Sequence, residues 1–203
     1  MRPPRLDRTD AELDYLGEAE HQRVFAKAFD GDPDFLVPKV VASAPKVVVS
    51  EWMNGIPLSK LITDGTQAQR NEAAARMAQF EISSPYRVGL LHGDPHPGNF
   101  FIADDGRFGV LDFGAVGFYP DGLPADTGPI LKLARDRDYD ELRDLLVATD
   151  FIRPSHASKV SAEDIEAYLK LRLDRLPDHP VNRVEELLPW AVAAELPALR
   201  LAA

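Results

Sequence analysis

The residues with the clearest potential for chemistry lie between His92 and Gly114. The run opens as HGDPHPGN (92–99) and closes as DFG (112–114), with two short apolar segments between them. Asp94 is a carboxylate in a loop stiffened by two prolines, while Asn99 and Asp112 offer an amide oxygen and a carboxylate oxygen. Hard oxygen donors of this kind suit Mg²⁺, which takes one or two protein ligands and completes its shell with water and phosphate oxygens.

A β-hairpin is expected to bring the two ends of this run together. Asp105-Gly106 between the apolar segments is typical of a two-residue type I′ turn. That turn would place Asn99 directly opposite Asp112 at the open end of the hairpin. The sequence therefore predicts a magnesium site held by Asn99 and Asp112, with Asp94 beside it as the catalytic carboxylate.

An aspartate, an asparagine five residues later and a downstream Asp-Phe-Gly form the catalytic-loop and metal-binding signature of kinase-like phosphotransferases. The alternative is that Asp94 and Asn99 are only turn residues and Asp112 only ends a strand. We expect His92 to be structural, packing the loop through a ring hydrogen bond. The role of His96 is left open, with a solvated loop histidine as the simpler interpretation.

Mostly helical elements are expected to position these residues. The first helix should span 10–30, with Thr9 or Asp10 as its cap and Gly31 just beyond its end. A short buried strand is expected at 47–49 and a helical turn at 58–62. Further helices are expected at about 66–82, 128–136, 138–149, 161–176 (with a Ser161/Asp164 capping box) and 184–196.

Composition narrows the function classes. The 203 residues carry a formal net charge of −10, which disfavours a general nucleic-acid binder. The absence of cysteine excludes disulfides and thiolate metal sites. We see no apolar segment typical of a signal peptide or a membrane span, so a cytoplasmic chain is expected, with membrane association left open.

The text HGDPHPGNFF…GVLDFGAVG, preceded by ELDYLGEAE and VVVSEWMNGIPLSKL, resembles the AarF/UbiB/ADCK atypical kinase family, which is linked to coenzyme Q biosynthesis. The resemblance runs from about Glu12 to Gly117. It implies an α+β, protein-kinase-like fold with a mainly helical C-terminal lobe, a small β-hairpin and a truncated N-lobe. The corresponding division is 1–53 as the N-lobe remnant and 54–203 as the C-lobe.

The resemblance also implies roles for individual residues. Asp94 is the catalytic-loop aspartate, and Asn99 and Asp112 are ligands of Mg²⁺ beneath ATP or ADP. The segment Glu51, Trp52 and Met53 is the hinge that meets adenine. Glu18 matches the glutamate that pairs with the ATP-binding lysine, and Glu12 and Asp14 match an E-x-D element. Independently, Asp14 and Glu18 lie four residues apart on one helix face, where two like charges favour a cation between them.

The phosphate-binding lysine of a kinase should precede Glu18, but the first lysine of this sequence is Lys27. Lys39 and Lys46 are expected to be surface lysines. The sequence therefore resembles the back half of an atypical kinase. We expect weak or undetectable Mg²⁺-dependent nucleotide binding, and transfer that is lower still.

Four candidate functions follow. The leading one is an atypical kinase or ATPase acting on an unknown small-molecule or lipid acceptor, since no A-P-E segment typical of protein kinases follows Gly117. The second is an inactive, pseudokinase-like scaffold or a gene fragment that needs a separate N-lobe. A small-molecule phosphotransferase of the aminoglycoside- or choline-kinase type, and a metal-dependent hydrolase, remain as further alternatives. Peripheral membrane contact and self-association through the surface facing the N-lobe are left open.

Overall fold

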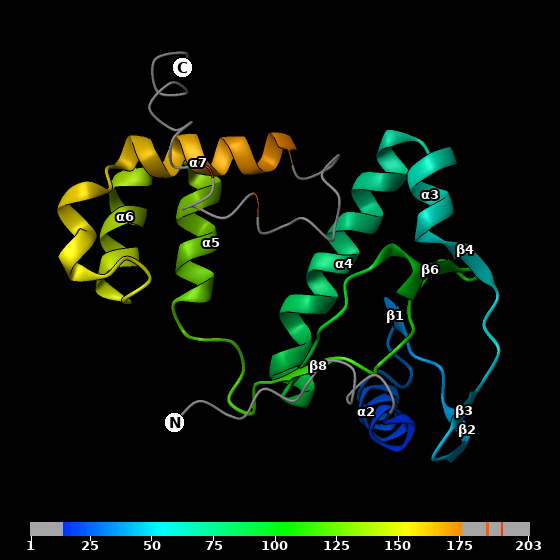
Figure 1. The fold of residues 1–203 in the computed structure, drawn as a ribbon. Coiled ribbons are helices and arrows are strands. Elements are labelled where there is room, and N and C mark those ends of the chain that lie inside the picture. The colour runs from blue at the N-terminus through cyan, green and yellow to red at the C-terminus, as the bar shows by residue number, and fades with distance from the viewer. Residues whose placement is uncertain (1–13, 176–185, 187–191, 193–203) are drawn as a thin grey trace. The chain divides into compact units, whose positions relative to one another are not determined.

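The computed structural model describes residues 14–175, Glu186 and Val192, and Figure 1 shows its ribbon. The chain divides into two compact units between Leu123 and Pro124. The first unit mixes helices and short strands, and the described elements of the second are helical. The lobe division at residues 53 and 54 is a different kind of boundary and stays a prediction.

Short strands alternate with three helices in the first unit. Its elements are α2 (Tyr15–Ala28), β1 (Phe35–Leu36), β2 (Val40–Ala44), β3 (Val47–Ser50), β4 (Gly55–Pro57), α3 (Leu58–Asp64), α4 (Gln67–Val88), β5 (Leu90–His92), η1 (Pro97–Asn99), β6 (Phe100–Ala103), β7 (Phe108–Val110) and β8 (Val116–Phe118). A four-stranded sheet has the order β1-β7-β6-β4, and β2-β3 and β5-β8 form separate antiparallel pairs.

The second unit contains α5 (Thr127–Asp136), α6 (Tyr139–Ala148), η2 (Pro154–Lys159) and α7 (Ala162–Arg175). These bounds confirm the three helices expected at 128–136, 138–149 and 161–176. The capping box is also confirmed, because Ser161 Oγ accepts from the Asp164 N–H at 3.3 Å while the Asp164 carboxylate accepts from the Ser161 N–H at 2.9 Å. The helix expected at 184–196 lies outside the continuously described residues. Within residues 14–175, no helix combines the length and apolar character needed to cross a bilayer.

The helix expected at 10–30 is α2, and its cap differs from the expectation of Thr9 or Asp10. The N-cap is Asp14, whose Oδ1 accepts a hydrogen bond of 2.9 Å from the Gly17 N–H. A Cβ at Gly17 would lie 2.5 Å from Asp14 Oδ2, so the glycine leaves room for this cap. The Asp14 carboxylate is therefore engaged in capping the start of α2.

Helix α4 is longer than the expected span of 66–82. It continues through Pro85 and ends at Gly89, which adopts the left-handed conformation with φ +69°. Proline in the last turn is tolerated here, and the glycine cap sets the end of the helix. The strand expected at 47–49 is present as β3, but it is not buried: Val47 and Val49 are each almost half exposed.

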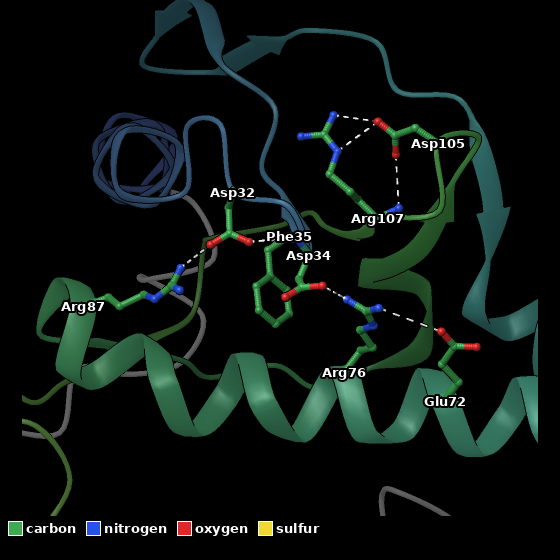
Figure 2. Close-up of polar contacts among 8 residues, drawn as sticks. All are labelled: Asp32, Asp34, Phe35, Glu72, Arg76, Arg87, Asp105 and Arg107. Atoms are coloured by element: carbon green, nitrogen blue, oxygen red, sulfur yellow. Dashed lines mark hydrogen bonds and ion pairs between the residues drawn. The ribbon is translucent and has the colours of Figure 1, made fainter.

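Two ion pairs fasten α4 to the loop before β1 (Figure 2). Arg76 pairs with Asp34, and Arg87 Nη1 lies 2.6 Å from Asp32 Oδ2. The other carboxylate oxygen of Asp32 accepts from the backbone N–H groups of Asp34 and Phe35. Burial acts to raise the pKa of Asp32, but Arg87 and the backbone donors together hold it below its usual value. The loop is therefore held against α4 at both carboxylates.

A cluster of phenylalanines forms the centre of the first unit. Its members come from α2, β1, α4, β6, β7 and the DFG segment, and each is at most 2% exposed: Phe25, Phe29, Phe35, Phe80, Phe100, Phe108 and Phe113. Phe80 of α4 lies with its ring centroid 5.1–5.8 Å from the rings of Phe25, Phe29 and Phe35. The cluster joins the helices to the strands that carry the candidate site.

Replacing Phe80 with alanine should lower the free energy of unfolding by about 3–5 kcal/mol, because the side chain is fully buried and its loss leaves a cavity. Ile82→Ala on the same helix is the control: Ile82 is 45% exposed, so its loss should cost less than about 1 kcal/mol. Urea denaturation followed by circular dichroism measures both. Equal losses would show that α4 does not carry the core as described.

Candidate functional site

The loop between β5 and β6 brings Asp94 and Asn99 into direct contact. Asn99 Nδ2 donates to Asp94 Oδ2 at 3.0 Å and to the Asp94 backbone carbonyl at 3.2 Å. His96 caps the short helix η1, since its Nδ1 accepts from the Gly98 N–H at 3.1 Å. Its ring therefore has a local structural role in this loop. Asp94 and Asn99, which the sequence placed in one candidate site, are therefore in direct contact.

The hairpin β6–β7 is present, but its register differs from the expectation by one residue. Phe100 pairs with Val110, and the Leu111 N–H donates to the Asn99 carbonyl at 2.8 Å. Asn99 therefore lies opposite Leu111, and Asp112 follows one position later. The prediction that Asn99 and Asp112 form a direct cross-strand pair was wrong.

The reason for the shift lies in the turn. Ala103 and Arg107 close a three-residue loop in which only Gly106 has a positive φ, of +89°. Asp105 does not adopt the positive φ that a type I′ turn demands, and its carboxylate instead accepts from the Arg107 N–H and from the Arg107 guanidinium (Figure 2). A three-residue loop that ends in a left-handed glycine is the next most common hairpin connection.

Asp112 occupies a special backbone position. Its φ is +59°, a left-handed conformation that is uncommon for a non-glycine residue. Asp112 Oδ1 accepts from the Gly114 N–H at 3.2 Å. The Asp112 carbonyl lies 2.6 Å from His92 Nε2, and the Leu111 carbonyl lies 3.1 Å from the same atom. These contacts confirm that His92 fixes the loop through its ring, as expected.

Helix α2 brings a second carboxylate to the DFG segment. A Cβ built at Gly114 would lie 3.3 Å from Asp112 Oδ1 and 3.9 Å from Glu18 Oε2, so both carboxylates flank this glycine. Burial first, and then the charge of Asp112, raise the pKa of Glu18. His21 lies one turn further along α2, and its Nδ1 donates a hydrogen bond of 3.2 Å to the Phe113 carbonyl. The arrangement concentrates negative charge where a cation would relieve it.

The segment from Glu51 to Met53 links β3 to β4. The Glu51 carboxylate accepts from the Lys39 N–H at 3.0 Å, and the Glu51 N–H donates to the Lys39 carbonyl. Trp52 is 88% exposed, with its indole N–H bonded to Asn54. Lys39 itself pairs with Asp30 on the surface, which agrees with the expectation of a surface lysine. The hinge role of the segment stays a prediction, and Glu12 lies outside the described residues.

Sequence reasoning missed Glu81, which lies behind the loop on α4. Glu81 Oε1 and His92 Nδ1 are buried and 3.9 Å apart, and neither has a hydrogen-bond partner among the described residues. Burial raises the pKa of Glu81 to about 7. Nothing local marks Glu81 in the sequence. His21 could have been found, since it shares a helix face with Glu18.

The fold and the polar residues of the loop are those of a kinase-like class. The chain is similar to the solved structure of Rv3197 from Mycobacterium tuberculosis, a complex with erythromycin, with a TM-score of 0.72 and 36% identity. The match covers 95% of this chain and 55% of that one. The chain thus has an α+β, kinase-like fold.

A model of the ABC1 atypical kinase-like domain matches residues 7–146. The chain therefore belongs to the ABC1 (AarF/UbiB) atypical kinase-like family, which confirms the resemblance that the motifs carry. Matches to curated relatives include an uncharacterized aarF domain-containing protein kinase (At1g71810) of Arabidopsis thaliana, 33% identical over 152 residues, and the atypical kinase COQ8B of Danio rerio, 34% identical over 113 residues. These matches cover 71% and 54% of this chain, but only 20% and 18% of the relatives.

The pKa of Glu81 makes stability depend on pH. In the folded chain the raised pKa keeps the proton on Glu81 up to about pH 7, whereas the unfolded chain releases it near the ordinary glutamate pKa of 4.5. Parent stability should therefore fall as pH rises through this window. Glu81→Gln removes the titration, so its stability relative to the parent should rise by about 1–2 kcal/mol between pH 5 and pH 8, after allowing for partial solvent access.

Urea denaturation at the two pH values measures the effect. Glu72→Gln, which removes an exposed carboxylate from the same helix, is the control. An equal change in both variants would contradict the assignment of this effect to the buried carboxyl of Glu81.

Proposed function

We propose that this chain binds ATP or ADP together with Mg²⁺ and supports phosphoryl transfer or ATP hydrolysis. The observation that carries the proposal is the contact between Asn99 and Asp94, together with the Asp112 and Glu18 carboxylates that flank Gly114. Membership of an atypical kinase family supports nucleotide binding.

The residues present fit a magnesium ion. Asn99 uses its Nδ2 on Asp94, which leaves its side-chain oxygen as an acceptor. Asp112 spends Oδ1 on the Gly114 N–H and retains a second carboxylate oxygen. Burial first, and then the charge of Asp112, raise the pKa of Glu18, and a cation bound nearby would favour the charged form of both carboxylates. When bound, the ion would neutralise charge on the phosphate oxygens.

Each residue then has a defined task. Asp94 accepts the proton of the attacking hydroxyl or orients a water molecule, and its bond with Asn99 fixes the direction of its carboxylate. Asn99 and Asp112 hold the ion, and Glu51, Trp52 and Met53 meet the adenine, as the family resemblance implies. Because phosphoryl transfer depends on position and charge, small errors in this arrangement cost rate.

The acceptor that we propose is a small molecule or a lipid, with a role in quinone or isoprenoid lipid metabolism. Family resemblance and the lack of an A-P-E segment after Gly117 support this class. A cytoplasmic location with peripheral membrane contact is part of the same proposal. Self-association is supported by exposed apolar side chains on the β2–β3 pair, where Val41 is 68% exposed.

The first test is Asp112→Asn, with Mg²⁺-dependent ATP binding measured by calorimetry. Loss of the carboxylate should weaken binding at least about tenfold in the presence of Mg²⁺, because a charged ligand of the ion is lost. Asp104→Asn is the matched control, since it removes an exposed carboxylate at the far end of the same hairpin. Equal Mg²⁺-ATP affinity in the parent and in Asp112→Asn would contradict the proposed magnesium site.

The second test separates binding from chemistry. Asp94→Asn should keep Mg²⁺-ATP affinity within a few fold but reduce phosphate release or transfer by roughly 10²–10⁴-fold, the usual contribution of a general base. Single-turnover assays with radiolabelled ATP measure the rate. A parent chain that binds Mg²⁺-ATP without any turnover would favour the scaffold function over the enzyme.

A further inference from the structure

The ring of His92 is oriented by two acceptors. Its Nε2 lies 2.6 Å from the Asp112 carbonyl and 3.1 Å from the Leu111 carbonyl. Carbonyl oxygens only accept, so Nε2 must carry the hydrogen. In a neutral ring the other nitrogen, Nδ1, then presents a lone pair.

That lone pair is directed into the core, toward Glu81. The His92 side chain is 0% exposed, and Nδ1 lies 3.9 Å from Glu81 Oε1. Neither atom has a hydrogen-bond partner among the described residues. Unpaired buried polar atoms cost free energy, and these two are the only such side-chain atoms in the described part of the chain. A change in the Glu81 side-chain torsions that shortens this distance by about 1 Å would give both atoms a hydrogen-bond partner.

The surroundings favour a neutral pair. The ring centroids of Phe80, Phe100 and Phe113 lie 6.5, 5.3 and 5.4 Å from that of His92. Burying charge in such an apolar cage is expensive, whereas a neutral donor and a neutral acceptor are tolerated. Burial likewise keeps the Glu81 carboxyl protonated to about pH 7, and a protonated carboxyl donates where a carboxylate would repel the lone pair.

We propose that the Glu81 carboxyl donates a hydrogen bond to Nδ1 of His92 and so keeps Nε2–H directed at the Asp112 carbonyl. Glu81 is then a positioning residue for Asp112, acting from the core side of the loop. Its effect on nucleotide binding rests on the proposed role of Asp112, but the hydrogen bond itself does not.

The direct test is the protonation state of the His92 ring, read from side-chain ¹⁵N chemical shifts of the full 203-residue chain. The chain has five histidines, so His92→Asn assigns the signal. We expect a neutral ring with the hydrogen on Nε2 in the parent and in Glu81→Gln, whose amide can still donate. Glu81→Leu should show a mixture of tautomers. A doubly protonated parent ring, or an unchanged ring in Glu81→Leu, would overturn the proposal.

The second readout is Mg²⁺-dependent ATP affinity. Glu81→Leu should weaken it about tenfold or more, as loss of a residue that orients a metal ligand typically does. Glu81→Gln should restore it to within about twofold, which a purely volume-related role would not do. Glu72→Leu, at an exposed position on the same helix, should leave it unchanged.

The ¹⁵N chemical shifts and the Mg²⁺-ATP affinity test different statements. A parent chain without Mg²⁺-ATP binding refutes the proposed function, while the ¹⁵N spectrum still decides the hydrogen bond. If Glu81→Leu does not fold, the parent and Glu81→Gln spectra decide alone: a neutral Nε2–H ring in both supports the proposal, and a charged ring in either overturns it.

Discussion

The candidate site depends on one hydrogen bond, between the buried His92 ring and the backbone carbonyl of Asp112. This bond joins strand β5 to the DFG segment and holds Asp112 in a left-handed conformation. The ring can serve because the phenylalanine cluster surrounds it and excludes water. Because the ring end of the bond is shielded from water, the bond is stronger than the same bond at the surface. The packing of the core around His92 therefore also determines the position of Asp112 in the candidate site.

The negative charge of the site is arranged from two directions. Helix α2 contributes the Glu18 carboxylate, and the DFG segment itself contributes Asp112, so that both flank Gly114. Burial first, and then the charge of Asp112, raise the pKa of Glu18, so a counter-charge at this position would be favourable. Neighbouring carboxylates with a raised pKa are typical of sites that hold a cation or a phosphate-bound ion, because such sites give up some stability for binding.

Some of the structure follows from short-range signals. The pairing of Asp94 with Asn99 was predictable, since both lie in one proline-stiffened loop. The hairpin itself was also predictable, but its register was not. A single choice at Asp105, between a left-handed backbone and a side-chain bond to Arg107, moved every pair by one residue. Turn type is decided by energies of about 1 kcal/mol, which nearby contacts easily outweigh.

The sequence by itself determined the family, the described helices α5, α6 and α7, the Ser161 capping box and the proline-stiffened loop that holds Asp94 and Asn99. These depend on residues close together in the chain, whose propensities and spacing act locally. Only the tertiary structure decided that Glu81 faces His92, that His21 contacts Phe113 and that Glu18 shares Gly114 with Asp112. Such contacts join residues that are far apart in sequence, and they depend on the packing of the phenylalanine cluster, which brings α2, α4 and the DFG segment together.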